Sequence, residues 1–221
     1  MWGAFENRQD AGRKLADVLY DKYNGQNVVV LSLPRGGVPI GHIVAQRLGA
    51  PHDIVVPRKI GCPGHEEFAI GALTEEGDVV LNEDVIRSLA LERSAIQATI
   101  EREKKEAQRR LQAYRGDKPK PNLSGKTVIL IDDGVATGST ARAALRTIKS
   151  HNPQKVVLAT PCMPADTKRD MEEQKICDDV VSLIAPHNFR SVGQWYKFFD
   201  QTSDEEVIRL LQQSPAPLKT K

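Results

Sequence analysis

Residues 128–140 read VILIDDGVATGST, and this stretch decides how the rest of the chain is interpreted. Four consecutive aliphatic residues are typical of a strand that is buried on both faces, as in a parallel sheet. Asp132 and Asp133 follow at its carboxyl end, where an open α/β sheet binds its ligands. Two neighbouring carboxylates at such a place are costly unless hydroxyls, amide donors or a cation meet them. The stretch therefore predicts a polar ligand beside this strand.

The turn after the two acids consists of small residues and hydroxyls, and it leads into an Ala-rich helix predicted over 140–149. Backbone N–H groups at such a helix start suit a phosphate. Acids that bind a sugar diol, next to a phosphate cradle, indicate a site for a ribose 5-phosphate. The alternative is an ordinary turn in which the acids end a strand and a Ser or Thr caps the helix.

The same residues resemble the 5-phosphoribosyl diphosphate (PRPP) signature of type I phosphoribosyltransferases. That signature has hydrophobic strand residues, two acids and a loop of the D-D-x-x-x-T-G-x-T kind, and its defined positions are occupied here by Asp132, Asp133, Thr137, Gly138 and Thr140. The resemblance covers the core and implies an α/β fold: a three-layer core with a mainly parallel sheet, a small hood and a helical insertion.

Two further stretches resemble the family. Residues 33–37 (LPRGG) follow a predicted strand, 27–33, at the place where the family holds pyrophosphate. Arg35 offers a planar fork of donors to phosphate oxygens, and Gly36 and Gly37 permit close approach of backbone amides. The resemblance also suggests a cis peptide near Arg35–Gly36. Taken alone, the stretch favours a plain turn with a surface arginine, and its pairing with residues 128–140 favours the phosphate-binding interpretation.

Arg58 and Lys59 end a second predicted strand, 53–56, where adenine- and orotate-type enzymes carry an Arg-Lys pair. The resemblance implies that they neutralise departing pyrophosphate. The loop that follows Lys59 contains no further lysine, and there the likeness to the family fades. Cys62 and His65 have a C-x-x-H spacing, but without another ligand pair a solvated histidine is favoured over a zinc site.

The reaction implied by the resemblance transfers a 5-phosphoribosyl group from PRPP to a nitrogenous base or related nucleophile, with release of pyrophosphate, in nucleotide salvage or metabolism. Mg²⁺ is the expected cofactor, bound mostly through PRPP and water with Asp132 and Asp133 nearby. Arg58, Lys59, Asp132 and Asp133 are the predicted catalytic residues. The predicted PRPP-binding residues are Arg35, Gly36, Gly37, Asp132, Asp133, Gly134, Val135, Ala136, Thr137, Gly138, Ser139 and Thr140.

Recognition of the base is expected from the aromatic tail 189–200, where Phe189 and Trp195 are the candidates for acceptor stacking. The alternative is that these rings anchor the chain end to the core. Ala136 stands where hypoxanthine-guanine enzymes have an aspartate that helps deprotonate the purine, which disfavours 6-oxopurines as acceptors.

Strand and helix signals alternate along the chain, which predicts one domain, 1–221, with a parallel core over about 27–185. Residues 57–82 are interpreted as a flexible loop with a hairpin tip around 75–78, residues 83–116 as a helical insertion, and 186–221 as a hood and tail. Helix 91–114 has a narrow apolar stripe, which packs either on its own domain or on a second chain.

Composition limits the classes of function. A net charge of +2 and 27% charged residues give no electrostatic footprint for nucleic acid. The apolar runs are too short for a membrane span and the N-terminus lacks a signal core, so a cytoplasmic protein with no membrane partner is expected. Three cysteines without a C-x-x-C pair predict buried thiols rather than disulfides.

Two rival functions remain open. A PRPP-binding regulator or sensor retains the cradle without catalysis, and a PRPP-forming kinase or generic nucleotide binder is the other, although no G-x-x-x-x-G-K-[ST] loop is present to support nucleotide binding. A homodimer is expected because dimers are common among relatives.

Overall fold

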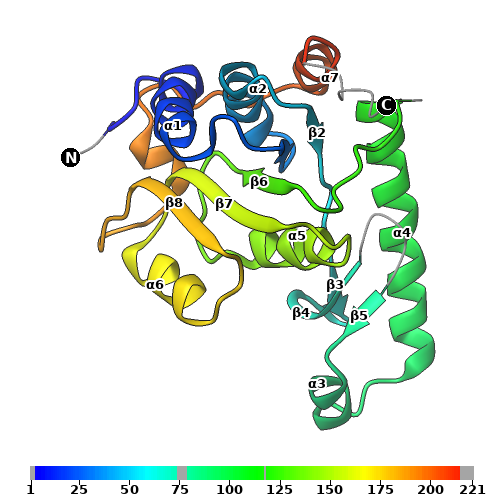
Figure 1. The fold of residues 1–221 in the computed structure, drawn as a ribbon. Coiled ribbons are helices and arrows are strands. Elements are labelled where there is room, and N and C mark those ends of the chain that lie inside the picture. The colour runs from blue at the N-terminus through cyan, green and yellow to red at the C-terminus, as the bar shows by residue number, and fades with distance from the viewer. Residues whose placement is uncertain (1–2, 74–78, 117, 215–221) are drawn as a thin grey trace.

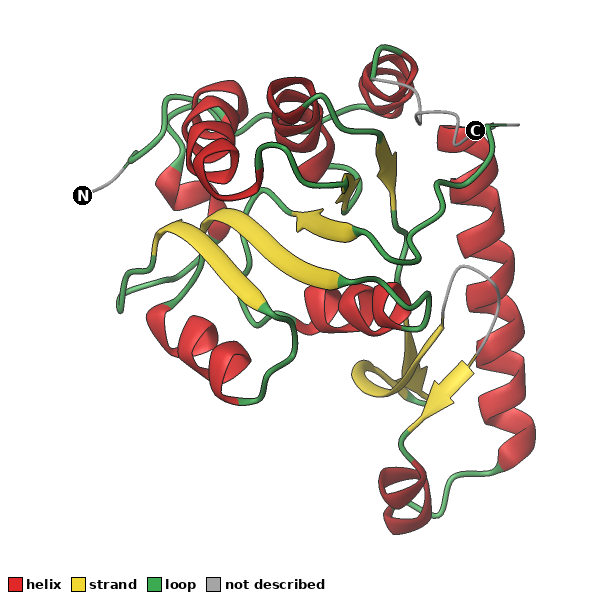
Figure 2. Cartoon of the chain, viewed as in Figure 1, coloured by secondary structure: helices red, strands yellow, loops and turns green. Residues whose placement is uncertain are grey.

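A computed structural model of the chain describes residues 3–73, 79–116 and 118–214. Helices and strands alternate through most of it (Figures 1 and 2). In chain order the elements are α1 (Arg8–Tyr23), β1 (Val28–Ser32), α2 (Gly37–Leu48), β2 (His52–Ile54), β3 (Arg58–Cys62), β4 (His65–Leu73), β5 (Val79–Leu81), α3 (Glu83–Ser88), α4 (Arg93–Arg115), β6 (Thr127–Ile131), α5 (Ser139–Lys149), β7 (Lys155–Cys162), α6 (Ala165–Glu173), β8 (Asp179–Ile184), the 3-10 helix η1 (Val192–Trp195) and α7 (Asp204–Gln212).

The main sheet has five strands in the order β2-β1-β6-β7-β8. Every neighbouring pair in it is parallel. The predicted mainly parallel α/β core is therefore confirmed. Because β1 and β6 are adjacent and in register from Val28↔Thr127 to Ser32↔Ile131, their carboxyl ends lie side by side.

Helices cover both faces of this sheet, which makes three layers (Figure 1). Successive residues of a strand point to opposite faces, and β6 shows the result. Val128 and Leu130 pack in the cluster that contains α5 and α6, whereas Ile129 and Ile131 pack in the cluster that contains α1 and α2. This explains why β6 is an uninterrupted aliphatic run: neither of its faces meets water.

Residues 57–82 contain three strands, where the sequence indicated a flexible loop with a hairpin tip. β3, β4 and β5 form a separate antiparallel sheet. Ile60 and Ile70 are fully buried in a small core of their own, which also receives Ile86 of α3. The hairpin tip expected around 75–78 lies outside the described residues. Whether this segment moves stays a prediction.

The long helix α4 packs on its own chain, which decides between the two interpretations of its apolar stripe. Ile96 and Ile100 at one end are buried against the β3–β5 sheet. Tyr114 at the other end packs with Val207 of α7. The helix thus connects the small sheet to α7 along one side of the molecule (Figure 1).

The two terminal segments lie side by side near the carboxyl end of the main sheet. Phe5 and Tyr196 form an isolated parallel bridge, and the N–H of Phe5 donates to the carbonyl of Trp195. Ser203 caps α7 by accepting from the N–H of Glu206.

None of the helices in the described ranges is long and apolar enough to cross a membrane.

The three cysteines are free thiols, and all of them are buried. Cys162 and Cys177 are packed among strand and helix residues of the core, in agreement with their interpretation as small core residues. Burial raises the pKa of the Cys177 thiol, and it raises that of Cys162 to about 12.

Candidate active site

The two loops that the sequence singled out meet at the carboxyl ends of β1 and β6. The N–H of Leu33 donates to the carbonyl of Ile131 at 2.9 Å, which joins the end of one strand to the end of the other. Residues 33–37 therefore lie beside residues 132–140. A cis peptide bond links Pro34 and Arg35, one bond before the place suggested by the resemblance.

Two glycines make this close approach possible. A Cβ atom added to Gly37 would lie 2.7 Å from the carbonyl oxygen of Ile131, and one added to Gly36 would lie 2.0 Å from Oδ2 of Asp133. Both distances are shorter than any normal van der Waals contact. Glycine is therefore required here because the backbone of one loop touches the other loop.

Asp132 and Asp133 are half-buried beside one another, immediately after β6. The Oδ1 atom of Asp132 accepts a hydrogen bond from the backbone N–H of Asp133 at 2.9 Å. Burial raises the pKa of the Asp132 carboxyl well above its usual value, and the charge of Asp133 raises it further. Burial also raises the pKa of Asp133, although Arg8 opposes this shift.

Arg8 is a residue of the site that sequence analysis did not find. Its Nε and Nη2 atoms both lie 2.8 Å from Oδ2 of Asp133, and its Nη1 atom donates to the carbonyl of Asp200 at 2.5 Å. Its guanidinium also lies 4.0 Å from the centroid of the Phe199 ring. One oxygen of Asp133, Oδ2, is thus already paired with Arg8, and the expectation that both carboxylates face a sugar stays a prediction.

The aromatic tail forms one border of the acid pair. The hydroxyl of Tyr196 donates to the carbonyl of Asp133 at 2.5 Å, and Phe199 stacks on the Tyr196 ring with centroids 4.9 Å apart. A Cβ on Gly134 would lie 2.3 Å from Cγ1 of Val192, so η1 presses directly on the loop after β6. The tail therefore holds this loop from one side.

The predicted acceptor residues Phe189 and Trp195 contact one another, with centroids 6.0 Å apart. Trp195 is 5% exposed and belongs to the cluster of Phe5 and Tyr196. Its ring therefore anchors the terminal segment, which was the alternative to base stacking. Phe189 is only half-buried, and its role in acceptor binding stays a prediction.

The loop that leads into α5 has the form expected for a phosphate cradle. Gly138 precedes the helix in a left-handed conformation with φ of 77°, which favours glycine. Thr137 and Ser139 share a hydrogen bond of 3.2 Å between their hydroxyls, and both side chains are exposed. The hydroxyl of Thr167 in α6 donates to the carbonyl of Ala136 at 2.9 Å and braces the loop from behind.

One residue of this loop differs from expectation. The N–H of Val135 donates to the carbonyl of Cys162 at 3.0 Å, and its side chain is 2% exposed. Val135 therefore ties the loop to β7, and its amide is not available to a phosphate. Donors for a phosphate must come from the later part of the loop and the first turn of α5.

A pocket of about 400 Å³ lies beside this loop and contains the predicted Arg58 and Lys59. The first turn of α5 contributes Ser139 and Thr140 to its wall. The remaining lining residues are Leu33, Pro34, Val56, Pro57, Gly61, Arg102, Glu103, Arg110 and Ala143. The structure thus brings the Arg-Lys pair to one pocket with Pro34 of the loop after β1 and Ser139 at the start of α5, while Asp132 and Asp133 lie outside this pocket wall.

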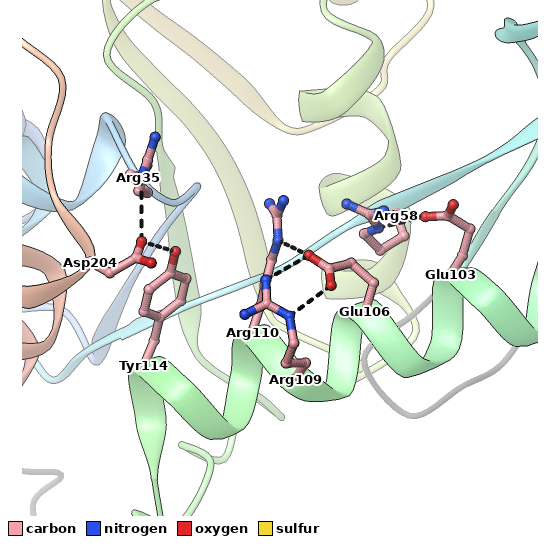
Figure 3. A network of polar contacts seen from close by, with 8 residues as sticks. All are labelled: Arg35, Arg58, Glu103, Glu106, Arg109, Arg110, Tyr114 and Asp204. Carbon is pink, nitrogen blue, oxygen red and sulfur yellow. Dashed lines mark hydrogen bonds and ion pairs between the residues drawn. The ribbon is translucent and has the colours of Figure 1, made fainter.

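The two predicted arginines are held by carboxylates outside the main sheet (Figure 3). Arg58 forms an ion pair with Glu103 of α4, with Nε 2.7 Å from Oε2. Arg35 lies 3.5 Å from Oδ1 of Asp204, which also accepts a hydrogen bond of 2.7 Å from the Tyr114 hydroxyl. Arg35 remains 43% exposed, so the guanidinium is accessible.

No group of three His, Cys, Asp or Glu side chains is arranged for a metal within the described ranges. His65 is exposed while Cys62 is buried, as expected for a solvated histidine rather than a zinc ligand. Asp132 and Asp133 supply two carboxylates at the strand end. Such a donor set fits Mg²⁺, which keeps several waters and binds through one or two carboxylates together with phosphate oxygens of a substrate.

Sequence comparison agrees with this geometry. The sequence model described as "Phosphoribosyl transferase domain" matches residues 1–203. The chain belongs to the phosphoribosyl transferase domain family. Two curated proteins from Mycobacterium tuberculosis, strains CDC 1551 and H37Rv, carry the provisional name phosphoribosyl transferase and are each 44% identical over 207 residues. These residues are 94% of this chain and 46% of each relative, so the chain spans about half the length of the curated relatives.

A solved structure has the same fold as this phosphoribosyl transferase domain. The crystal structure of TT1426 from Thermus thermophilus has a TM-score of 0.83 and 37% identity, over 96% of this chain and 99% of that one. A hypoxanthine phosphoribosyltransferase from Staphylococcus aureus aligns with a TM-score of 0.46 and 13% identity, over 82% of this chain and 74% of that one. The second likeness is too weak to bear on the acceptor.

Proposed function

We propose that this phosphoribosyl transferase domain transfers a 5-phosphoribosyl group from PRPP to a nitrogen nucleophile, with release of pyrophosphate, in nucleotide salvage or metabolism. The observation that carries the proposal is the joining of the two loops. The hydrogen bond between Leu33 and Ile131 brings a pyrophosphate-type turn against a strand that ends in two acids and a phosphate-type loop. A ligand with a sugar between a phosphate and a diphosphate matches this order of groups.

In this proposal the exposed hydroxyls of Thr137, Ser139 and Thr140 bind the 5-phosphate, together with the first amides of α5. Asp132 lies near the ribose, where its negative charge stabilises the positive charge that gathers on the ring as the bond to pyrophosphate breaks. Arg35, Arg58 and Lys59 neutralise the leaving group. Mg²⁺, held by Asp132 and Asp133 with substrate oxygens and water, would supply further neutralisation of the pyrophosphate charge.

In this proposal Asp133 receives the substrate while it has an ion-pair partner within the chain. Arg8 occupies its Oδ2 atom in the described conformation. Binding of the ribose hydroxyls or of a hydrated cation would then either displace Arg8 or use Oδ1. Burial raises the pKa of Asp133, and Arg8 opposes this rise because a guanidinium favours the charged form of a carboxyl.

The acceptor in this proposal is a base other than a 6-oxopurine, because Ala136 carries no group that could take a proton from the ring. Phe189 is the remaining aromatic candidate for stacking on it. We also propose a homodimer, which multi-angle light scattering of the purified protein would test.

A pyrophosphate-release screen tests the function. The protein is incubated with PRPP and magnesium against a panel of purines, pyrimidines and small amines. Release that depends on one acceptor is the expected result. Asp133→Asn should lower turnover by about 100-fold or more, since it removes a charge at the reacting centre. Asp17→Asn, in a 71% exposed side chain, is the control and should leave turnover unchanged.

The second candidate function is a PRPP sensor that binds without turnover. The ion pair between Arg8 and Asp133 favours it, because a carboxylate held by an arginine is less available to a substrate. Calorimetry with PRPP and magnesium, run beside the release screen, separates the two. If the protein binds PRPP but releases no pyrophosphate with any acceptor of the panel, the sensor function replaces the transferase function. If the protein shows no PRPP binding and no pyrophosphate release, both functions are refuted.

A further inference from the structure

Helix α4 forms a wall of the pocket that holds Arg58 and Lys59. It contributes Arg102, Glu103 and Arg110. Pro34 of the pyrophosphate-type turn and Thr140 at the start of α5 also line the pocket. A helix that the sequence placed outside the site thus faces both ligand-binding loops.

The pocket is strongly positive. Its cationic lining residues are Arg58, Lys59, Arg102 and Arg110, whereas Glu103 is its acidic one. Glu103 is already paired with Arg58 and lies 3.5 Å from Nε of Arg102. Each of these cations already has a partner within the chain, but four cationic side chains around one concave site still favour a ligand with several negative charges.

Arg110 is oriented by a neighbouring carboxylate. Its Nε atom donates to Oε1 of Glu106 at 2.8 Å, and Arg109 donates to both oxygens of the same carboxylate (Figure 3). The two arginines differ in position: the Arg110 side chain is 40% exposed and lines the pocket, whereas that of Arg109 is 66% exposed and does not. An arginine fixed through Nε presents its terminal nitrogens in a set direction, which suits two phosphate oxygens.

We infer that Arg110 and Arg102 of α4 bind the pyrophosphate group of the substrate. They supply the positive charge that the loop after Lys59 lacks, since that loop carries no second lysine. The inference rests on the proposed function for the identity of the ligand. The contact is made across the pocket, from the inserted helix to the two loops of the main sheet.

Titration calorimetry with inorganic pyrophosphate and magnesium chloride tests this inference, with Arg109→Ala as the matched control. Both variants lose an arginine that contacts Glu106, but only Arg110→Ala removes a pocket residue. We expect Arg110→Ala to weaken pyrophosphate binding about ten-fold or more, and Arg109→Ala to change it less than about two-fold. Arg102→Ala should weaken it as well. Arg110→Gln, which keeps the side-chain length, replaces Arg110→Ala if the latter does not fold.

The outcomes separate the inference from the proposed function. Equal binding by the Arg109 and Arg110 variants, whether both weak or both unchanged, overturns the inference. If wild type releases pyrophosphate from PRPP in that case, the proposed function stands without it. If wild type releases none while Arg110→Ala still weakens pyrophosphate binding selectively, the α4 site stands and the transfer reaction fails. Wild type that binds neither PRPP nor pyrophosphate refutes both.

Discussion

Replacing Arg8 by methionine tests the electrostatics of the site. The variant keeps a long side chain but leaves Asp133 without its cation. The two charges lie 2.8 Å apart, which corresponds to about 6 kcal/mol of attraction at an effective dielectric constant of roughly 20. Desolvation cancels much of this. The side chains are only 13% and 15% exposed, so the cost falls between that of an exposed pair and that of a fully buried pair.

We expect Arg8→Met to lower the free energy of unfolding by about 2–3 kcal/mol at pH 7. For a chain of this size that corresponds to a fall in Tm of roughly 5–10 °C. Lys14→Met is the control, because Lys14 lies on the same helix in an ion pair with Asp10 but is 51% exposed. Its loss should cost no more than about 0.5 kcal/mol. Calorimetric melting of the three proteins gives both numbers.

The pH dependence gives a second signature of the same pair. Without Arg8, burial alone acts on Asp133, so its pKa in the folded variant rises further above the usual value of 3.8. A carboxyl with a raised folded-state pKa takes up its proton more readily than in the unfolded chain, and stability is lost as the pH rises through that pKa. The difference in the free energy of unfolding between Arg8→Met and wild type should therefore become smaller as the pH falls toward 4.

A double-mutant cycle of Arg8→Met and Asp133→Asn isolates the coupling between these two side chains from the other contacts of Arg8. Arg8 also contacts Asp200 and Phe199, and those contacts survive in Asp133→Asn. We expect a coupling energy of about 1–3 kcal/mol. A coupling near zero, or an Arg8→Met melting temperature equal to that of Lys14→Met, would refute the reasoning.

Two further predictions concern the junction of the loops. Asp132→Asn should raise the Tm at pH 7, because the raised pKa of Asp132 means that its ionisation lowers the stability of the folded protein. This gain in Tm should vanish as the pH falls below about 4, where the carboxyl is protonated in both states. A gain in Tm that persists at acid pH would contradict this cause. Gly37→Ala should lower stability by about 1–3 kcal/mol, since its Cβ would lie 2.7 Å from a backbone carbonyl oxygen. Gly25→Asn, at φ of 78° in open space, is its control in the same melting experiment, and equal melting of the two variants would argue against a clash at Gly37.

The parallel core was predictable because its signals are local. Buried strands such as β6 are continuous aliphatic runs, and helices such as α7 begin at a capping serine. The small sheet was less predictable. β3 begins at Arg58 and Lys59, which are polar, and its hydrophobic residues are too few for an alternating pattern. It is a strand because β4 pairs with it and because Ile60 has a core to enter, and neither fact is visible locally.

The site divides in the same way. The sequence singled out Asp132, Thr137 and Gly138 because one contiguous stretch carries acids, hydroxyls and a turn glycine that suit a phosphorylated sugar, and their role in binding stays a prediction. Trp195 became a stacking candidate because a sequence does not distinguish an aromatic ring that lines a site from one that anchors a chain end, and only the structure shows that its ring is buried beside Phe5 and Tyr196. Val135 was assigned an amide for phosphate, but that amide bonds to β7, which only the pairing of distant segments reveals.

The sequence by itself determined the parallel core and the family, and it predicted where a ligand binds, because strand burial, helix capping and the loop motif each depend on residues that are neighbours along the chain. Only the tertiary structure brought Arg8 to Asp133, 125 positions away, and set the arginines of α4 opposite the phosphate loop. The physical reason is that a charge acts through space over a few ångströms, so its partner depends on how the backbone folds and leaves no pattern in either segment alone.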